Sequence, residues 1–307
     1  MAQNNLAVID MGSNSFHLLI AAPKASGWEP LCRDERKVQL AANRQGRRLC
    51  DEAVVRALSC LRLYLARIKE HGPCQLRIAA TASLRGVDSA AFLQAAEDLC
   101  GVRPQILSGE DEARFVYRGV CAEFTGEKTY LVVDVGGGST ELALGRGKTL
   151  LAHRSFDVGC LSYLRFFVDN ALSASAFLAA QQEAMAQFVE FLPHIPPEPV
   201  TVVGSSGSLL AVEAVLKATS KSRAGIHVAD LTWLAEDISR FDALGEVAYG
   251  GLSEDRRGVF ASGLAIVVAL FGSLRLTEMQ LSLLGLREGL LAVWLDELQG
   301  LEQLDES

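Results

Sequence analysis

The sequence has no cysteine pair at a spacing that binds metal or supports dithiol chemistry. Its seven cysteines are scattered, and none belongs to a C-x-x-C motif. The five histidines form no H-E-x-x-H motif either, so the usual zinc and redox motifs are excluded. An odd number of isolated cysteines predicts free thiols, packed as small hydrophobic side chains in a reducing cytoplasm.

The sequence also lacks an excess of basic residues. It has 29 Lys and Arg against 37 Asp and Glu, a net charge of -8. This balance argues against non-specific nucleic-acid binding, although a local basic pocket for a polyanion stays possible. The N-terminus has no basic signal region, and no apolar run reaches the ~18 residues that a membrane span needs. The nearest run, 261–270, is short and amphipathic. We therefore expect a cytoplasmic protein with no nucleic-acid or membrane partner.

Hydrophobic residues, in contrast, are abundant. They make up 50% of the 307 residues, and charged residues make up 21%. A chain of this length and composition folds into compact cores and is long for a single one, so we expect two domains. A polar stretch with a glycine, 123–128, predicts the boundary, with domains at 1–124 and 125–307 and a last helix, about 292–307, that packs back on the first.

Apolar periodicity and turn residues predict a mixed α/β architecture that starts with antiparallel strands in each half. Helices are expected at 51–71, 89–99, from 109, near 161–169, 173–192, from 207 to 217, near 229–239, 262–273 and 286–298. Strands are expected at 6–10, 16–21, 28–32, 37–40, 75–79, 105–107, 129–145 (a hairpin), 150–156, 200–203 and 278–281.

Two short stretches of the sequence share one pattern of residues. Residues 8–20 read VIDMGSNSFHLLI and residues 132–144 read VVDVGGGSTELAL. Each is a strand that ends on an aspartate, followed by glycine, small polar residues and a second strand. Glycine tolerates positive φ, so we expect successive backbone N–H groups to turn inward and bind an anion such as phosphate. Hydroxyl groups would add further donors: Ser13, Ser15, Ser139 and Thr140.

The aspartates of these loops need another explanation, because a carboxylate repels phosphate. Asp10 and Asp134 make sense as ligands of a hard cation, or as groups that orient water. Glu141 lies two residues after Ser139 and shares its face of the strand, so it could join them. The loops are not P-loops, since no Gly-Lys-Ser/Thr follows, and they are not dinucleotide fingerprints, since each leads into a strand. Two tight β-turns are the simpler explanation, but the duplication disfavours it.

Three acids open a helix between the two loops, in LSGEDEARFVYRGV at 107–120. Ser108 is a good N-cap, with Asp111 at the capping-box position, and all three acids complement the positive helix end. A carboxylate near a phosphate site can also act as general base on water. If Asp111 serves the cap, Glu110 and Glu112 both stay candidates.

Two further loops could bind phosphate. In AATASLRG, 79–86, Thr81 and Ser83 offer hydroxyls and Arg85 offers a guanidinium. An ordinary surface loop is the alternative. GSSG, 204–207, leads from a strand into a helix whose N-terminus could hold an anion, or it is simply a capped tight turn.

These motifs, together with VGCLSY and GLREGLL (285–291), resemble the Ppx/GppA family of exopolyphosphatases and guanosine pentaphosphate phosphohydrolases over nearly the whole chain. The resemblance implies a two-domain actin-like ATPase fold (ASKHA, ribonuclease H-like) with mixed sheets and an interdomain active-site cleft. It also implies that Glu112 is the catalytic base. It places phosphate contacts at Ser13, Asn14, Arg85, Gly136, Gly137, Gly138, Ser139 and Arg256, and Mg²⁺ or Mn²⁺ at Asp10, Asp134 and Glu141, with Cys160 near the pocket.

The activity implied is metal-dependent release of terminal phosphate from inorganic polyphosphate. Alternatives are hydrolysis of pppGpp at its 5′ end, a kinase or ATPase of the same superfamily, and a non-catalytic nucleotide sensor. Homodimers are common in the family. Gly119 and 123–128 could form a hinge, and Arg287 and Glu288 are expected to form a structural network. Basic residues that could guide a polyanion, or simply face solvent, are Arg33, Arg36, Lys37, Arg44, Arg47 and Arg48.

The chain departs from the family pattern in two places. Many members carry an aspartate two residues after the arginine that matches Arg256, whereas this chain has Gly258. The sequence also resembles the short two-domain branch, which lacks the helical extension that holds long polyphosphate. The resemblance therefore leaves open whether the protein binds very long polyphosphate chains.

Overall fold

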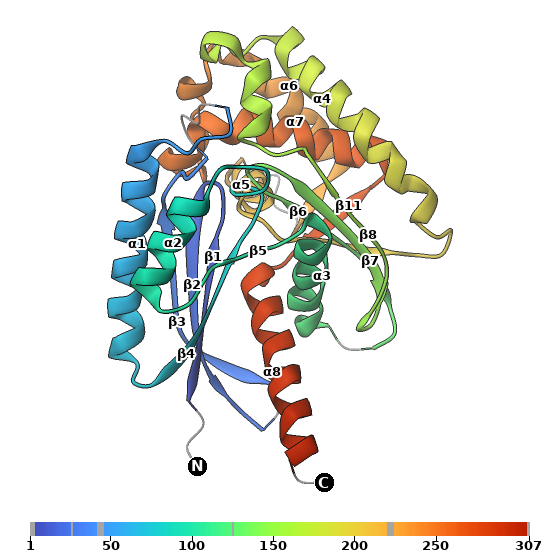
Figure 1. Ribbon diagram of the computed structural model, residues 1–307. Helices are drawn as coiled ribbons and strands as arrows, with labels where there is room; N and C mark the ends of the chain where they lie inside the picture. Colours follow the sequence, from blue (N-terminus) through green and yellow to red (C-terminus); the bar gives the residue numbers. More distant parts are fainter. Residues whose placement is uncertain (1–3, 26, 42–45, 125, 220–223, 306–307) are drawn as a thin grey trace. The chain divides into compact units, whose positions relative to one another are not determined.

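A computed structural model describes the chain except for residues 1–3, 26, 42–45, 125, 220–223 and 306–307, with no side chain described after residue 300 (Figure 1). The chain divides into two compact units. Unit 1 comprises Met1–Gly119 and Leu286–Ser307, and unit 2 comprises Val120–Gly285. The first unit therefore includes the whole last helix, and the chain leaves it a few residues before the predicted boundary at 124.

Unit 1 is built on a five-stranded sheet in the order β3-β2-β1-β4-β5. The strands are β1 (Asn5–Met11), β2 (Ser15–Pro23), β3 (Trp28–Lys37), β4 (Cys74–Ala80) and β5 (Gln105–Ile106). The first three pair antiparallel, and β4 and β5 are parallel to β1. The sheet is mixed, as expected.

Alternation along β1 separates two cores in unit 1. Ala7, Ile9 and Met11 pack with helices α1 (Asp51–Glu70) and α2 (Ala90–Cys100). Leu6 and Val8 pack with Trp294 and its neighbours in α8 (Leu286–Asp305). Figure 1 shows α1 and α2 on one side of this sheet and α8 on the other. Because side chains alternate, Asp10 points to the α8 side.

Unit 2 repeats this arrangement with a six-stranded sheet, β10-β11-β9-β6-β7-β8. The hairpin of β6 and β7 takes the place of β1 and β2, and β9 lies parallel to β6 as β4 lies parallel to β1. The duplicated sequence is thus a duplicated structure. The strands are β6 (Thr129–Val135), β7 (Thr140–Arg146), β8 (Thr149–Phe156), β9 (Thr201–Gly204), β10 (Ile226–His227) and β11 (Glu278–Leu281).

A large hydrophobic core of unit 2 includes most of α7 (Arg257–Ser273). The stretch Glu254–Ser273 has the length and composition of a membrane-spanning helix, but 67% of its most apolar window is buried inside the protein, as expected of a core helix. The remaining helices are α3 (Gly109–Val120), α4 (Ala174–Phe188), α5 (Gly207–Ala218), α6 (Val228–Asp237) and α7 (Arg257–Ser273). Short 3₁₀ turns lie at Cys121–Glu123, Ser162–Phe166, Val168–Asn170, Val189–His194, Ile238–Arg240, Leu244–Glu246 and Glu254–Arg256.

Three expectations about single elements were wrong. The strand expected at 28–32 runs on to Lys37 as β3, whose charged residues hide its periodicity, and the strand expected at 37–40 does not form. The helix expected near 161–169 is a pair of 3₁₀ turns with Asp169 at positive φ. The two-residue strand β10 was not predicted, because two residues carry no periodic signal.

Candidate functional site

Asp10 is a partly buried residue near the end of β1, and one oxygen of its carboxylate is buried. Its Oδ1 has no hydrogen-bond partner within the described residues. Burial, followed by the charge of Glu112, raises the pKa of Asp10 to about 7, and Arg287 opposes this shift. A buried carboxylate without a hydrogen bond is costly. Asp10 therefore lies where a cation or a proton donor would stabilise it.

Glu112 and Arg85 contact each other in the same unit. Arg85 Nη1 lies 2.5 Å from Glu112 Oε2, and the two side chains are 24% and 11% exposed. Burial raises the pKa of Glu112, while the charge and hydrogen bond of Arg85 lower it. Arg85 is held in place by the loop after β4, where Ser83 Oγ donates to the Met11 carbonyl at 3.2 Å. The structure thus pairs a guanidinium with a buried carboxylate.

The choice among the three helix-opening acids has a structural basis. Ser108 Oγ accepts from the Asp111 backbone N–H at 3.0 Å and donates to the Asp111 carboxylate at 2.8 Å. Asp111 also contacts Arg114, so it serves the helix start, as predicted. Glu110 is exposed, whereas Glu112 is buried. Of the three, only Glu112 combines burial with a contact to Arg85.

The predicted reason for the loop glycines was wrong. Gly12, Gly136, Gly137 and Gly138 are absent from the positive-φ glycines of the described chain, so neither loop forms a nest of left-handed residues. At two of these positions the glycine is explained instead by a neighbouring backbone atom that leaves no room for a Cβ. A Cβ on Gly12 would lie 2.8 Å from the Ser15 carbonyl oxygen, and one on Gly136 would lie 3.1 Å from that of Ser139.

A neighbouring segment occupies the carbonyl groups of the second loop. Cys160 N–H donates to the Gly136 oxygen at 3.0 Å, and Leu161 N–H donates to the Gly137 oxygen at 2.8 Å. The backbone N–H groups of Gly137 and Gly138 donate to no acceptor in the described part of the chain. Both residues are partly exposed. Two backbone donors are thus available to an anion without any left-handed residue.

Gly159 makes this arrangement possible, a role that its local sequence does not predict. A Cβ on Gly159 would lie 2.4 Å from the Gly137 carbonyl oxygen and 2.5 Å from the Gly138 carbonyl carbon. The signal was visible in VGCLSY, but a glycine alone does not reveal which distant backbone it touches. Thr140 was expected to donate to phosphate; its hydroxyl instead donates to the Val158 carbonyl at 2.5 Å.

Asp134 and Glu141 are directly opposite each other in the β6–β7 ladder. Opposed residues of an antiparallel pair share one face, and two like charges there are unfavourable unless something compensates them. Ser155 Oγ from β8 donates to Glu141 Oε1 at 2.7 Å. No cage of three or more metal-ligating side chains occurs within the described residues. Mg²⁺ needs only one or two carboxylates beside water and phosphate oxygens, so this pair fits such an ion.

Arg256 lies against the start of α5. A Cβ on Gly207, the first helical residue, would lie 1.9 Å from Arg256 Nη2. Ser206 caps the helix by accepting from the Leu209 N–H at 3.3 Å, as predicted. Burial raises the pKa of the nearby Cys160 thiol, and Ser208 and Arg256 oppose that shift. A guanidinium at the positive end of a helix favours an anion between them.

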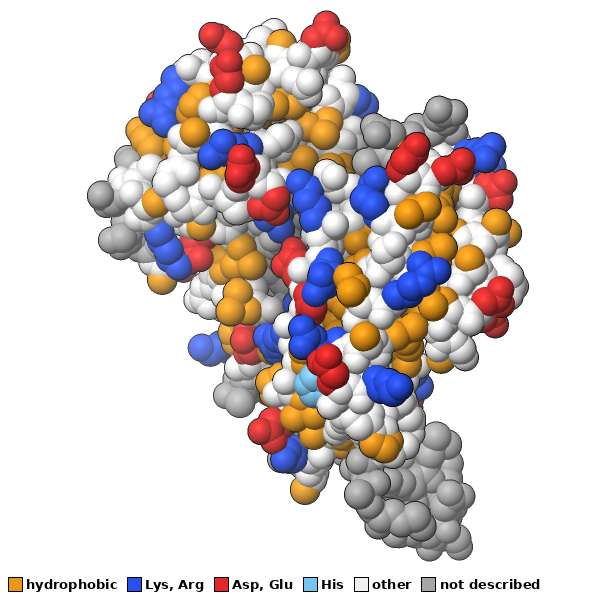
Figure 2. Space-filling view, turned by 90° about the vertical axis from the view of Figure 1, so that its left-hand side faces the viewer, with side chains coloured by type: hydrophobic (Ala, Val, Ile, Leu, Met, Phe, Trp, Pro, Cys, Tyr) orange, Lys and Arg blue, Asp and Glu red, His pale blue; other side chains and the backbone are white. Residues whose placement is uncertain are grey.

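The residues expected to guide a polyanion are largely engaged with carboxylates. Arg33 Nη2 lies 3.4 Å from Oε1 of the fully buried Glu288, which Arg287 also approaches at 4.0 Å. This is the structural network predicted for Arg287 and Glu288, with Arg33 as an unpredicted third member. Arg36 contacts Asp34, and Arg48 contacts Asp51. Arg44 lies outside the described residues. In Figure 2, basic and acidic side chains are interspersed on the face shown.

Comparisons with known proteins agree with these features. The Ppx/GppA phosphatase family matches residues 19–298. An exopolyphosphatase from Cytophaga hutchinsonii has 21% sequence identity and a TM-score of 0.84, covering 95% of this chain and 98% of its own. A Ppx/GppA family member from Aquifex aeolicus has 22% identity and a TM-score of 0.79, covering 96% and 98%. These likenesses confirm the predicted α/β fold class, and both sheets are mixed as expected.

Proposed function

Because the chain belongs to the Ppx/GppA phosphatase family, we propose that it hydrolyses the terminal phosphoanhydride bond of inorganic polyphosphate and releases orthophosphate. The observation that carries this proposal is the contact between Arg85 and the buried Glu112. A guanidinium binds phosphate oxygens through charge-assisted hydrogen bonds, and a carboxylate beside it can accept a proton from water.

Glu112 acts as the general base in this proposal. Its carboxylate accepts a proton from the water that attacks the terminal phosphorus in line with the leaving phosphate oxygen. Burial raises the pKa of Glu112, which makes the carboxylate a stronger proton acceptor than an exposed glutamate. Arg85 then exchanges part of its contact with Glu112 for the phosphate oxygens. In the free enzyme the charge of Arg85 favours the ionised form of Glu112 and so opposes the effect of burial on its pKa.

Unit 2 has donors of its own that suit the developing charge on a phosphate. The N–H groups of Gly137 and Gly138 and the guanidinium of Arg256 would bind phosphate oxygens. Ser13 and Asn14 of the first loop would do the same. Their carbonyl groups accept from the 38–41 segment, as in the Val38 N–H to Asn14 oxygen contact of 3.0 Å, which leaves the loop held in place.

A divalent cation, Mg²⁺ or Mn²⁺, would neutralise charge on the phosphate oxygens when bound. Asp134 and Glu141 fit such an ion because they oppose each other on one face of the β6–β7 ladder. Asp10 fits because its buried Oδ1 has no hydrogen-bond partner in the described chain. Ser155 would orient Glu141 through its 2.7 Å hydrogen bond.

The test is phosphate release from long polyphosphate, short polyphosphate and pppGpp with Mg²⁺. Glu112→Gln should lower kcat by roughly 100- to 10,000-fold, the usual contribution of a general base, while substrate still binds. Glu110→Gln is the matched control, because this neighbouring acid is exposed, and it should keep wild-type activity. The ranking of substrates separates polyphosphate from pppGpp hydrolysis.

Two results would contradict the proposal. If the wild type binds these phosphates but releases none, a nucleotide or polyphosphate sensor becomes the better explanation. If Glu110→Gln and Glu112→Gln lose activity equally, the helix start as a whole matters and Glu112 is not the base.

A further inference from the structure

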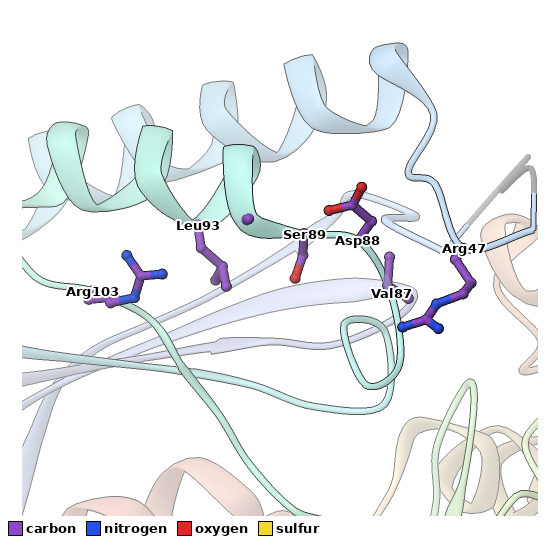
Figure 3. A pocket seen from close by; sticks show the side chains of 7 residues that line it. Arg47, Val87, Asp88, Ser89, Leu93 and Arg103 are labelled. Carbon is purple, nitrogen blue, oxygen red and sulfur yellow. The ribbon is translucent and has the colours of Figure 1, made fainter.

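Unit 1 has a surface pocket of about 610 Å³ at the start of α2, outside the candidate site, and several polar residues line it. Figure 3 shows Arg47 and Arg103 at its two ends with Ser89 between them. The complete lining is Arg47, Val87, Asp88, Ser89, Ala90, Leu93 and Arg103.

Ser89 is the observation that points to a ligand. It precedes the first helical residue of α2 and is only 6% exposed, yet its side chain makes no capping hydrogen bond. Its backbone has φ -116° and ψ 6°, which differs from the extended conformation that a capping serine usually adopts. No hydrogen-bond partner for its hydroxyl occurs among the described residues. A serine that is almost wholly buried, lines a pocket and bonds to no described residue leaves its hydroxyl available to a molecule in that pocket.

The start of α2, whose first residue Ala90 lines the pocket, adds backbone donors. The first hydrogen bond of α2 runs from the Leu93 N–H to the Ser89 carbonyl at 2.8 Å. The N–H groups before it, of Ala90, Ala91 and Phe92, have no acceptor within the helix. The first turn of α2 also carries no acidic side chain, unlike that of α1 or α3. The positive end of the helix is therefore not compensated by its own residues.

The charges around the pocket favour an anion. Arg47 makes no ion pair within the described residues, and its backbone carbonyl is fixed by the Asp88 N–H at 2.8 Å. Arg103 Nη1 contacts Glu97 Oε2 at 2.6 Å, but both side chains are well exposed, so this pair is weak. Asp88 opposes an anion. Figure 3 shows its carboxylate pointing away from the hydroxyl of Ser89.

We propose that this pocket binds a condensed phosphate, meaning two or more linked phosphoryl groups. Two guanidinium groups at opposite ends, with a hydroxyl and helix N–H donors between them, match several phosphates better than one compact anion. The ligand is either the distal part of a polyphosphate substrate or a separate nucleoside triphosphate. Only the first source rests on the proposed function.

The test is a titration of the ²H,¹⁵N-labelled full-length chain with tripolyphosphate, followed by NMR. The Glu112→Gln variant serves as host so that no hydrolysis occurs. The amide signals of Ser89 to Phe92 should shift and saturate. Arg47→Gln with Arg103→Gln should weaken this response by about tenfold, since exposed guanidinium contacts contribute modestly, and leave shifts at 136–139 unchanged. Asp88→Asn should strengthen it.

Arg62→Gln is the matched control, because this exposed arginine of α1 lies outside the pocket lining. It should bind tripolyphosphate like the host. The proposal fails if the amides of Ser89 to Phe92 do not shift, if the double variant responds like the host, or if inorganic sulfate shifts them as strongly as tripolyphosphate. Shifts at 136–139 alone would keep the proposed function and reject the pocket.

Two assays distinguish the sources once the pocket binds. If the double variant raises KM for long polyphosphate but not for tripolyphosphate, the pocket holds the distal substrate. If a nucleoside triphosphate shifts Ser89 to Phe92 and changes the turnover of tripolyphosphate only when Arg47 and Arg103 are present, the pocket holds a separate effector. Either result supports the site.

Discussion

At the residue scale, Arg85 opposes the effect of burial on the pKa of Glu112. Burial raises the pKa of Glu112 above the ordinary 4.5, and Arg85 lowers it again. A general base works only when ionised, so activity is lost as pH falls through this pKa. Arg85→Gln removes the lowering charge. We therefore expect the acid limb of the kcat/KM profile to move to higher pH, measured by phosphate release across a pH series. Arg62→Gln should leave the limb in place, and a limb that moves to lower pH would contradict the assignment.

Single residues also show where sequence reasoning reaches its limit. The loops, the aspartates and the cap at Ser108 could be predicted, because the sequence patterns of hairpins and helix starts are local. The contact of Arg33 with Glu288 was not, because these residues are far apart in the sequence and meet only through packing. The role of Gly159 was hidden for the same reason, since the atoms that exclude its Cβ belong to Gly137 and Gly138.

At the element scale, α8 packs on α3 through a glycine. A Cβ on Gly289 would lie 1.7 Å from the Phe115 carbonyl oxygen and 3.1 Å from the Gly119 backbone nitrogen. Backbone atoms move little, so Gly289→Ala should destabilise unit 1 by about 1–3 kcal/mol or more. The measurement is urea unfolding followed by circular dichroism. Gly119, considered as a hinge, is here a buried packing residue of α3.

Gly300 provides the control within the same helix. No heavy atom lies within 4 Å of a Cβ built there. Gly300→Ala should therefore be neutral or stabilise the protein by about 0.5–1 kcal/mol, because alanine loses less entropy in a helix. Equal destabilisation by both substitutions would show that helix propensity, and not the contact with α3, decides the outcome.

At this scale the fold was largely predictable. The repeat of strand, aspartate loop and strand gave both hairpins, and helical periodicity gave α1 and α8. The bounds of β3 were predicted wrongly because this strand lies at a sheet edge, where charged side chains take the place of an apolar alternation. The prediction for the glycine loops was right about their position and wrong about the reason for the glycines. Glycine is needed either where φ is positive or where another backbone comes close. The structure shows that the second reason applies here.

At the scale of the whole molecule, the chain builds separate cores for its two units. Trp294 of α8 is buried against Leu6, Val8 and Leu19 in unit 1, with the Arg77 guanidinium 4.4 Å from its ring centre. Phe188 is fully buried in the core of unit 2. Trp294→Ala should cost unit 1 about 3–5 kcal/mol, as large-to-small core substitutions do. Native-state hydrogen exchange should therefore accelerate in β1 and β2 and stay unchanged in β6 and β7. Phe188→Ala should give the opposite pattern. If either variant accelerates exchange equally in both sheets, the two cores unfold as one cooperative unit, and the return of α8 to unit 1 stabilises the whole chain.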